Sequence, residues 1–392
     1  MSERYDLAMR FAHLALVALC DCSGCGQIAD EPDTGSDAAM CSNDFGAPSR
    51  WTFFDIADVT PPAPGFLGAS YVDQHVYFAP ALNDKTPSGL IVRESTAAPF
   101  TELPSWESFD LTTIDPSFTH FNGTVADAHA VYLFSGSAPI IVRHDSSSPF
   151  ASSWTSFDVS KVDPQAAQFS GALALSSSVI FYGSWFARYD ATMAFDDPTA
   201  WRTVDFVGGC AGSAFDGRYT YFGCTSWIER YDTTLAFNSP IPWSTYNLPA
   251  AAGVNGAFSS VFDGRYVYFA QYKGTTIVRF DTTAKSFTTD AGWSFVDLQP
   301  MLPATVEGFQ DVRFDGRYVY ATPPIEGSVM ARFDTHGSFT DLAAWSSLDL
   351  LTLDPRAERF YGSAFDGHYL YFAPEPGGHH VAARYDTTAC GD

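Results

Sequence analysis

Short apolar runs separated by polar turns recur along most of this chain. The clearest copy spans residues 262–298 and reads FDGRYVYFAQYKGTTIVRFDTTAKSFTTDAGWSFVDL. Its runs are rich in Tyr, Phe, Val and Ile, which suit strands packed on a pleated surface. The Asp-Gly pair predicts a tight hairpin, because Gly accepts the positive φ that such turns require. The copy predicts four strands: Ala257–Phe262, Arg265–Ala270, Thr276–Asp281 and Trp293–Leu298.

Two landmarks fix the number of copies. A Trp followed four residues later by Asp or Asn opens the fourth strand of each copy, and an Arg lies in each third strand. The Trp landmarks are about 49 residues apart on average, and a period of about 40–50 residues built from short strands is typical of a β-propeller blade. We therefore predict an all-β, seven-bladed β-propeller with four antiparallel strands per blade. The landmarks are Trp51, Trp106, Trp154, Trp201, Trp243, Trp293 and Trp345, and Arg93, Arg143, Arg188, Arg230, Arg279, Arg332 and Arg384.

The order of the landmarks predicts how the ring closes. Residues 51–56 read as a fourth strand with no blade before it, whereas the last copy ends after its third strand at Arg384–Asp386. The N-terminal strand is therefore expected to complete the last blade, which would remove an exposed sheet edge. Small residues open most inner strands and fit the narrow centre of such a ring; they are Gly68, Gly123, Gly171, Gly212 and Gly362.

The seven Arg landmarks favour a structural role over a ring of anion sites, because a residue present once in every blade usually builds the blade. Arg279 and Asp281 alternate on one strand face, and Asp297 lies on the neighbouring strand. A repeated Arg–carboxylate pair within or between blades is therefore expected.

The composition narrows the choice of partner. The 392 residues include 45 acidic and 21 basic side chains, for a formal charge of −24. Such a surface disfavours nucleic acid and anionic lipid, while cationic partners, neutral glycans, divalent metal or a plain role in solubility stay open. No apolar run approaches the roughly 20 residues of a membrane helix.

The first fifty residues differ in kind from the rest. Residues 1–25 contain the apolar run Phe11–Leu19 and read as an export signal. Ser23-Gly24-Cys25 resembles the end of a bacterial lipobox, so Cys25 is a candidate for lipidation, although Cys22 stands where that motif prefers Leu. Residues 26–50 are predicted to form a disordered tether, and residues 51–392 the propeller.

The remaining cysteines are consistent with an oxidising compartment. Cys210 and Cys224 flank the Asp216-Gly217 hairpin, and Cys41 and Cys390 flank the two chain ends. Of the three pairings that four cysteines allow, we predict Cys210–Cys224 and Cys41–Cys390. A Cys-based metal site is the less favoured alternative, because no CxxC lies outside the signal.

Candidate ligand-binding residues lie where the blades differ, in the loops that join second to third strands. Trp185 and Trp227 occupy equivalent places in adjacent blades; they either form a stacking platform for a sugar or cation, or cover the start of a strand. Tyr272 lies in the loop Gln271–Thr275. Glu375, His379 and His380 form a further irregular group. Adjacent His side chains on a strand point to opposite faces, so one shared metal is not expected.

No GxSxG, HExxH, P-loop or GxGxxG motif is present, and no catalytic residue, metal or cofactor is predicted. Scattered carboxylates near a channel could hydrolyse glycosides only at a set separation, which a sequence does not give.

The FDGRYVYFAP…VRFDTT portion of the copies resembles the repeats of bacterial YVTN and NHL propellers. The likeness covers the two middle strands of each blade, chiefly in blades four to seven. It implies the propeller fold and, by analogy, a surface or periplasmic binding scaffold. The leading hypothesis is an exported or surface-anchored, non-catalytic binding or adhesion module for carbohydrate or a cell-surface protein. The alternatives are a channel-mouth hydrolase or lyase acting on polysaccharide or a small ester or lactone, and a structural envelope protein.

Overall fold

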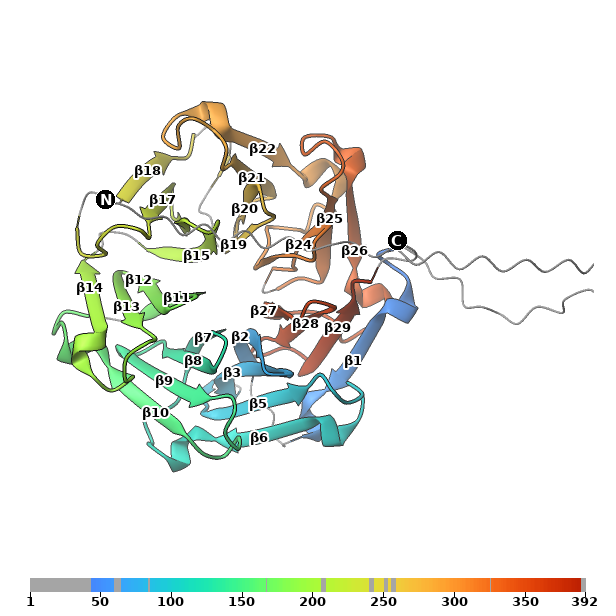
Figure 1. The fold of residues 1–392 in the computed structure, drawn as a ribbon. Helices are drawn as coiled ribbons and strands as arrows, with labels where there is room; N and C mark the ends of the chain where they lie inside the picture. Colours follow the sequence, from blue (N-terminus) through green and yellow to red (C-terminus); the bar gives the residue numbers. More distant parts are fainter. Residues whose placement is uncertain are drawn as a thin grey trace, which may run out of the picture. The chain divides into compact units, whose positions relative to one another are not determined.

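The strands of this computed structural model form seven antiparallel sheets arranged as a ring (Figure 1). The structure describes residues 44–59, 65–83, 85–166, 168–205, 209–239, 243–249, 253–254, 259–324 and 326–388. Six sheets have four strands, and the first carries a short additional strand. The predicted seven-bladed propeller is therefore confirmed.

The strands run outwards from the centre of the ring in each blade. Blade 1 contains β2 (Gly65–Val72), β3 (His75–Asn83), β5 (Leu90–Ser95) and β6 (Trp106–Asp110), with β4 (Thr86–Pro87) paired to β3; blade 2 contains β7 (Phe121–Ala126), β8 (Ala130–Ser135), β9 (Ile140–Asp145) and β10 (Trp154–Asp158); blade 3 contains β11 (Phe169–Leu175), β12 (Ser178–Gly183), β13 (Trp185–Asp190) and β14 (Trp201–Asp205); blade 4 contains β15 (Cys210–Phe215), β16 (Tyr219–Cys224), β17 (Trp227–Asp232) and β18 (Trp243–Asn247); blade 5 contains β19 (Ser259–Phe262), β20 (Tyr266–Ala270), β21 (Thr276–Asp281) and β22 (Trp293–Asp297); blade 6 contains β23 (Val312–Phe314), β24 (Tyr318–Ala321), β25 (Val329–Asp334) and β26 (Trp345–Asp349); blade 7 contains β27 (Phe360–Phe365), β28 (Tyr369–Pro374), β29 (Val381–Asp386) and β1 (Trp51–Asp55).

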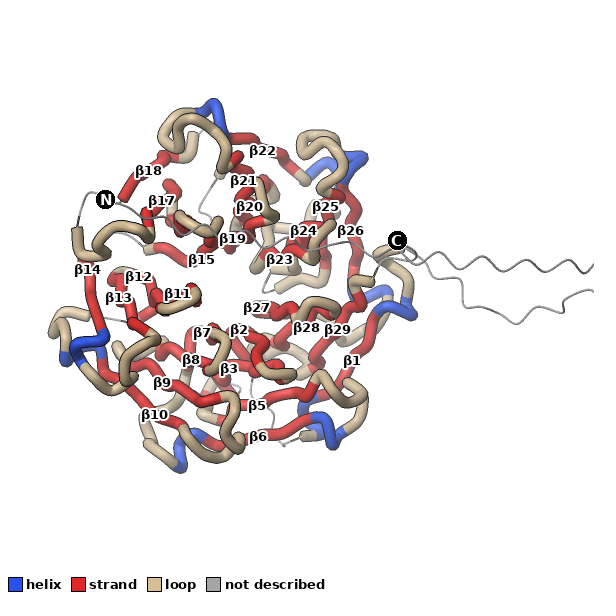
Figure 2. The backbone as a smooth tube through the Cα atoms, viewed as in Figure 1, coloured by secondary structure: helices blue, strands red, loops and turns tan. Residues whose placement is uncertain are grey.

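Short 3₁₀ turns before and after the outer strands are the helical elements of the described residues (Figure 2). None of the described helices is both long and apolar enough to span a bilayer. The turns are η1 (Pro48–Arg50), η2 (Ile56–Asp58), η3 (Leu103–Ser105), η4 (Leu111–Thr113), η5 (Val159–Lys161), η6 (Pro198–Ala200), η8 (Asp290–Gly292), η9 (Gln299–Met301), η10 (Leu342–Ala344) and η11 (Leu350–Thr352).

The ring closes as predicted. Strand β1 pairs antiparallel with β29, with Trp51 opposite Tyr385. Contacts with the ring begin before the expected boundary at residue 50, because Phe45 is buried against Tyr320 and Tyr385. Phe45 therefore packs where blades 6 and 7 meet, and the predicted domain bounds stay predictions. The expected signal (1–25) with its lipidation candidate Cys25, and the rest of the expected tether (26–43), lie outside the described residues.

The Asp-Gly hairpins are held by one repeated arrangement. In blade 5, Oδ1 of Asp263 accepts hydrogen bonds from the backbone amides of Arg265 and Tyr266, and Oδ2 accepts one from the Tyr268 hydroxyl at 2.7 Å. Gly264 has φ +101°, as the turn requires. The turn Asp and the Tyr five residues later thus fix both strands of the hairpin. The same set of contacts occurs at Asp216, Asp315 and Asp366.

The predicted Arg–carboxylate pair occurs in blade 1, where Arg93 pairs with Glu107 at 2.6 Å, but not between Arg279 and Asp281 in blade 5. Asp281 instead pairs with Arg265 of the hairpin, at 2.8 Å. The Arg279 guanidinium lies over the ring of Tyr266 at 4.1 Å and over Phe339, from the next blade, at 4.2 Å. The third-strand Arg therefore joins blades through aromatic rings, a contact in which its planar, weakly hydrated cation performs well.

Four other blades repeat this contact between neighbours. In each case the third-strand Arg lies over a Phe that precedes the Trp of the following blade. The carbonyl of that Phe accepts a hydrogen bond from the Trp indole. We call this arrangement the Arg–Phe–Trp seam. Its members are Arg93–Phe150–Trp154, Arg230–Phe287–Trp293, Arg279–Phe339–Trp345, Arg332–Phe45–Trp51 and Arg384–Phe100–Trp106.

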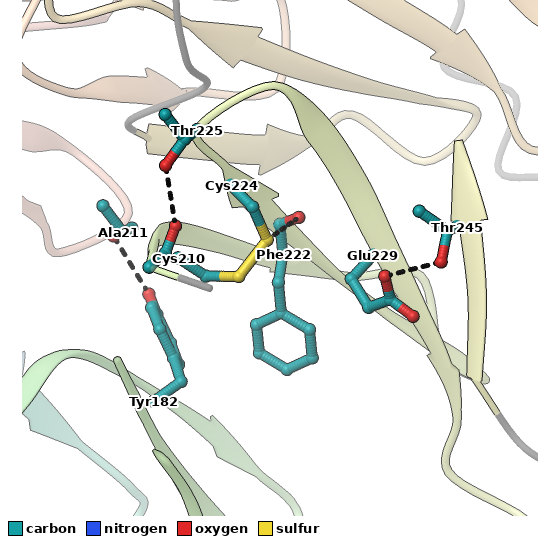
Figure 3. The surroundings of a disulfide bond; sticks show 9 residues. Tyr182, Cys210, Ala211, Phe222, Cys224, Thr225, Glu229 and Thr245 are labelled. Carbon is teal, nitrogen blue, oxygen red and sulfur yellow. Dashed lines mark hydrogen bonds between the residues drawn. A yellow bond between two sulfur atoms is a disulfide. The ribbon is translucent and has the colours of Figure 1, made fainter. Parts of the chain in front are cut away.

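The predicted Cys210–Cys224 disulfide is present. The two residues are directly paired in register on β15 and β16, with their Cα atoms 4.0 Å apart, and both are buried (Figure 3). The other predicted pair, Cys41–Cys390, lies outside the described residues.

The residue after each Arg landmark packs on the Trp of its own blade, and in most blades it is aromatic. Phe280 and Trp293, for example, have ring centroids 4.7 Å apart. Blade 1 departs from this pattern, because Glu94 takes the position opposite Trp106. Glu94 is fully buried, and neither carboxylate oxygen has a hydrogen-bond partner among the described residues. Burial raises the pKa of Glu94 to about 8, although Arg384 opposes the rise.

The seam predicts unequal effects for two Arg side chains that contact the same Tyr266 ring. Arg279→Ala should lower the free energy of unfolding by about 2–3 kcal/mol, because two desolvated cation–π contacts and a long apolar stem are lost. Arg265→Ala removes a guanidinium that is 58% exposed together with its surface ion pair, so the loss of stability should be much smaller than for Arg279→Ala. Denaturant unfolding of both variants measures the difference, and equal losses would contradict the seam.

Glu94 predicts a dependence of stability on pH. Its pKa is raised in the folded protein, so the folded state holds the proton to higher pH than the unfolded chain does. The wild type should therefore lose stability between about pH 5 and pH 8, by at most about 1.4 kcal/mol per pH unit from this group. Glu94→Gln should match the wild type near pH 4.5 and unfold at a higher temperature at pH 8–9. The exposed Glu102→Gln serves as the control, and a constant difference between Glu94→Gln and the wild type across this range would refute the argument.

Candidate functional site

The centre of the ring encloses a cavity of about 770 Å³. Inner strands β2, β7, β11, β15, β19, β23 and β27 contribute its walls, and these strands surround the centre in Figure 2. The glycines predicted at the start of the inner strands are required for steric reasons. A Cβ added to Gly362 would lie 2.6 Å from the Cα of Gly68, so the backbones of neighbouring inner strands meet too closely for a side chain.

Blades 5 and 6 break this glycine pattern. Ser259 and Asp311 stand where the other blades have glycine, and the Ser259 hydroxyl donates to Oδ1 of Asp311. Oδ2 of Asp311 accepts from the amide and the hydroxyl of Ser363, at 3.1 and 2.8 Å, and pairs with Arg313 at 2.9 Å. Asp311 therefore joins the inner strands of blades 5, 6 and 7. Its partners Ser259, Arg313 and Ser363 themselves line the cavity, which indicates a structural role.

We use the word mouth for the end of the cavity that is lined by Gly209 and Thr225, on the face that carries the loops between second and third strands and between fourth and first strands. We call this the loop face, and the face of the Asp-Gly hairpins the hairpin face. On the loop face, the amide of Phe309 donates to the carbonyl of Gln271 at 2.7 Å, and the amide of Glu375 donates to the carbonyl of Arg359 at 2.8 Å. These bonds hold the loops of blades 5 and 7 against the chain that enters the inner strands of blades 6 and 7.

Five side chains gather there, and we call them the mouth cluster: Tyr272, Gln310, Arg359, Tyr361 and Glu375. Arg359 donates through Nε to Glu375 at 2.9 Å, and its Nη2 lies 2.8 Å from the same oxygen. Tyr361 and Gln310 line the cavity. Tyr272 lies close enough to Tyr361 to influence its ionisation. The cluster therefore presents two phenols, an amide and an ion pair at one side of the mouth.

Burial shapes the ionisation of this cluster. It raises the pKa of Glu375, while Arg359 opposes the rise and Glu326 adds to it. Burial also raises the pKa of Tyr361; a hydrogen bond with Gln310 opposes that, and Tyr272, Asp311 and Glu375 add to it. With its pKa raised, Tyr361 keeps its proton at neutral pH and can donate as well as accept hydrogen bonds.

The predicted ligand-binding residues separate into two groups. Glu375 and Tyr272 belong to the mouth cluster. His379 lies beside it, with Nε2 3.4 Å from Glu358. His380 has a structural contact, because its carbonyl accepts a hydrogen bond from the amide of Ile56, just after the ring-closing strand.

Trp185 and Trp227 form the second group, in blades 3 and 4. Each begins the third strand of its blade, is half-buried and packs on a core cluster between blades. Part of each ring is therefore used in the core, and the stacking platform stays a prediction.

Sequence reasoning missed Gln310, Arg359 and Tyr361. They lie in the chain entering the inner strands of blades 6 and 7, where blade 7 reads Arg-Phe-Tyr-Gly and blade 6 reads Gly-Phe-Gln-Asp. The sequence holds a signal for Gln310 and Tyr361, because the residue after this Phe lines the cavity in several blades. Leu67, Asn122 and Ser170 occupy the same position.

The arrangement supports binding chemistry. Among the described residues that line the cavity, Asp311 is the one carboxylate, and its oxygens are already engaged. The described residues contain no group of three or more His, Cys, Asp and Glu side chains placed to hold a metal ion.

Comparisons with known proteins place the fold. No known family profile matches the chain, and no curated protein is similar in sequence. Solved propellers are similar in structure. YCF48 bound to D1 peptide matches with a TM-score of 0.60 and 14% identity over 88% of this chain and 97% of that one. The β-propeller domain of Cps50 (Swd1) from Myceliophteria thermophila matches with a TM-score of 0.54 and 8% identity, over 83% and 98%.

PorZ, a bacterial surface component of the type-IX secretion system of Porphyromonas gingivalis, matches with a TM-score of 0.54 and 12% identity over 88% of this chain. The present chain spans 40% of that protein. At such identities these likenesses show the propeller fold alone.

The Asp311 network predicts that one isosteric change will be costly. Asp311→Asn removes the charge opposite Arg313 and turns an amide NH₂ toward donors, so the free energy of unfolding should fall by about 2–4 kcal/mol. Ser259→Ala removes a single hydrogen bond from the same network and should cost about 1 kcal/mol. Thermal and denaturant unfolding compare the two, and a loss at Asp311→Asn no larger than at Ser259→Ala would contradict the network.

Proposed function

We propose that this protein is an exported, non-catalytic binding module that captures a cell-surface or extracellular partner at the mouth cluster. The observation that carries the proposal is the position of the cluster. In blades 5–7 the otherwise regular repeat departs from its pattern. Those departures place Tyr361 and Gln310 in the lining of a 770 Å³ cavity, with Tyr272 and the Arg359–Glu375 pair near Tyr361.

The residue types in the cluster suit recognition. Tyr supplies a large apolar face with a polar tip and loses little conformational entropy when it is fixed. The Arg359–Glu375 pair is mostly buried, with side chains 26% and 13% exposed, so it holds the surface in one conformation before a ligand arrives. Preorganisation of this kind lowers the free-energy cost of binding.

Two further observations support the proposal. A buried disulfide in blade 4 fits an oxidising compartment, because such bonds persist outside the reducing cytosol. Propellers of similar fold include a peptide-bound protein and a bacterial surface component. A carbohydrate ligand and a lipid anchor at Cys25 belong to this proposal as expectations from the sequence.

Peptide and glycan arrays probed with labelled protein test the proposal. Wild-type binding should fall at least about fivefold in Tyr361→Ala, because aromatic anchors near the centre of an interface often carry much of the binding energy. Leu235→Ala is the matched control, since Leu235 is an exposed side chain, 44% accessible, on the hairpin face.

Two outcomes would count against the proposal. Binding that survives Tyr361→Ala but is lost in Trp185→Ala or Trp227→Ala would move the site to blades 3 and 4. Silence of the wild type across both arrays would contradict a binding function.

A further inference from the structure

We infer that the mouth cluster receives a lysine or arginine side chain from a basic peptide segment of the partner. This inference rests on the proposed function and adds the chemical class of the ligand. It draws on three separate features of the mouth: its charges, its unpartnered polar atoms and its aromatic faces.

Two of the cations at the cavity are neutralised within the protein, while a third, Lys273, lies beside the ring of Tyr272. Arg359 is held by Glu375, and Arg313 by Asp311 and by the Ser363 carbonyl, to which Nη2 donates at 2.6 Å. Glu326 lies near enough to Glu375 to act on its ionisation, and Glu358 has the half-exposed His379 as its partner. An anionic ligand would therefore meet carboxylates in excess, whereas a cation would be attracted.

The cavity wall also holds acceptors that lack donors. The Gln310 side-chain oxygen has no hydrogen-bond partner among the described residues, and neither has the Ser260 hydroxyl. Both residues line the cavity and are 5% exposed. A buried polar atom without a partner is costly, so a ligand that supplies donors would be favoured. Ammonium and guanidinium groups carry donors only.

The two tyrosines complete the argument. A cation within about 6 Å of a ring centroid is attracted by the ring quadrupole, more strongly when water is excluded. The chain already shows such a contact here, because Nζ of Lys273 lies 5.9 Å from the centre of the Tyr272 ring. Tyr361 lines the cavity itself and presents the second ring to an incoming side chain.

The charge of the whole protein favours the same ligand. A formal charge of −24 would accelerate association with a basic segment and slow that with an acidic one. Such long-range attraction acts on the entire surface, so only changes at the mouth can distinguish a site from general attraction.

Fluorescein-labelled hexalysine, with hexaglutamate and unlabelled maltohexaose for comparison, tests the inference on the full chain. Hexalysine should bind by fluorescence anisotropy at 50 mM NaCl and weaken at least about tenfold at 500 mM. Glu326→Gln and Glu358→Gln should each raise Kd about three- to tenfold, and Tyr361→Ala at least about fivefold. Asp196→Asn removes one exposed carboxylate from the β13–β14 loop on the hairpin face and should change Kd less than about twofold.

The outcomes separate the two proposals. Equal effects of Asp196→Asn and the mouth variants would show general attraction and overturn the cationic site. Calorimetric binding of maltohexaose that Tyr361→Ala abolishes, without site-specific binding of hexalysine, would also overturn it and leave the proposed function standing. If no probe binds at the mouth and the arrays are silent, both proposals fail.

Discussion

The ring depends on how one blade is held to the next, and in five of its seams a stacked arginine makes that connection. The guanidinium from the third strand lies over the Phe of the following blade, whose carbonyl in turn fixes the Trp indole. Blades of a propeller have no covalent cross-links between their faces, so packing must set both their spacing and their rotation. The flat guanidinium and its apolar stem pack between the rings, while the charged group is not buried in a fully apolar core. In these five seams the Arg also fixes the position of the Trp in the following blade through the Phe carbonyl.

Much of this fold is legible in the sequence, because local rules and tertiary packing agree. The Asp-Gly turns, the period of the Trp landmarks and the unmatched strand at residues 51–55 predict the hairpins, the blade count and the closure, and all three are present. The Cys210–Cys224 pair could be placed because a hairpin fixes its register.

Contacts between blades were harder to predict. Arg279 and Asp281 share a strand face, yet the longer Arg side chain reaches the neighbouring blade, and Asp281 is taken by Arg265 across the hairpin. Phe45 shows the same limit, since nothing in its local sequence indicates that its ring completes a seam formed by residues from the other end of the chain.

The mouth cluster was predicted in part, through Tyr272 and Glu375. Tyr361 was missed because it lies in an inner strand whose sequence indicates only structural roles. Individual departures from a repeat deserve as much weight as the repeat itself.

The pairing of β1 with β29 has a consequence for biogenesis. Arg50 hydrogen-bonds to the carbonyl of Asp386, and 336 residues separate the two. During synthesis β1 emerges more than 300 residues before β29, so the seventh sheet cannot form until β29 has been translated. Until then β1 lacks its neighbour, and the nascent chain has an open, horseshoe-like form whose unpaired edge could be bound by chaperones or could mispair with another copy.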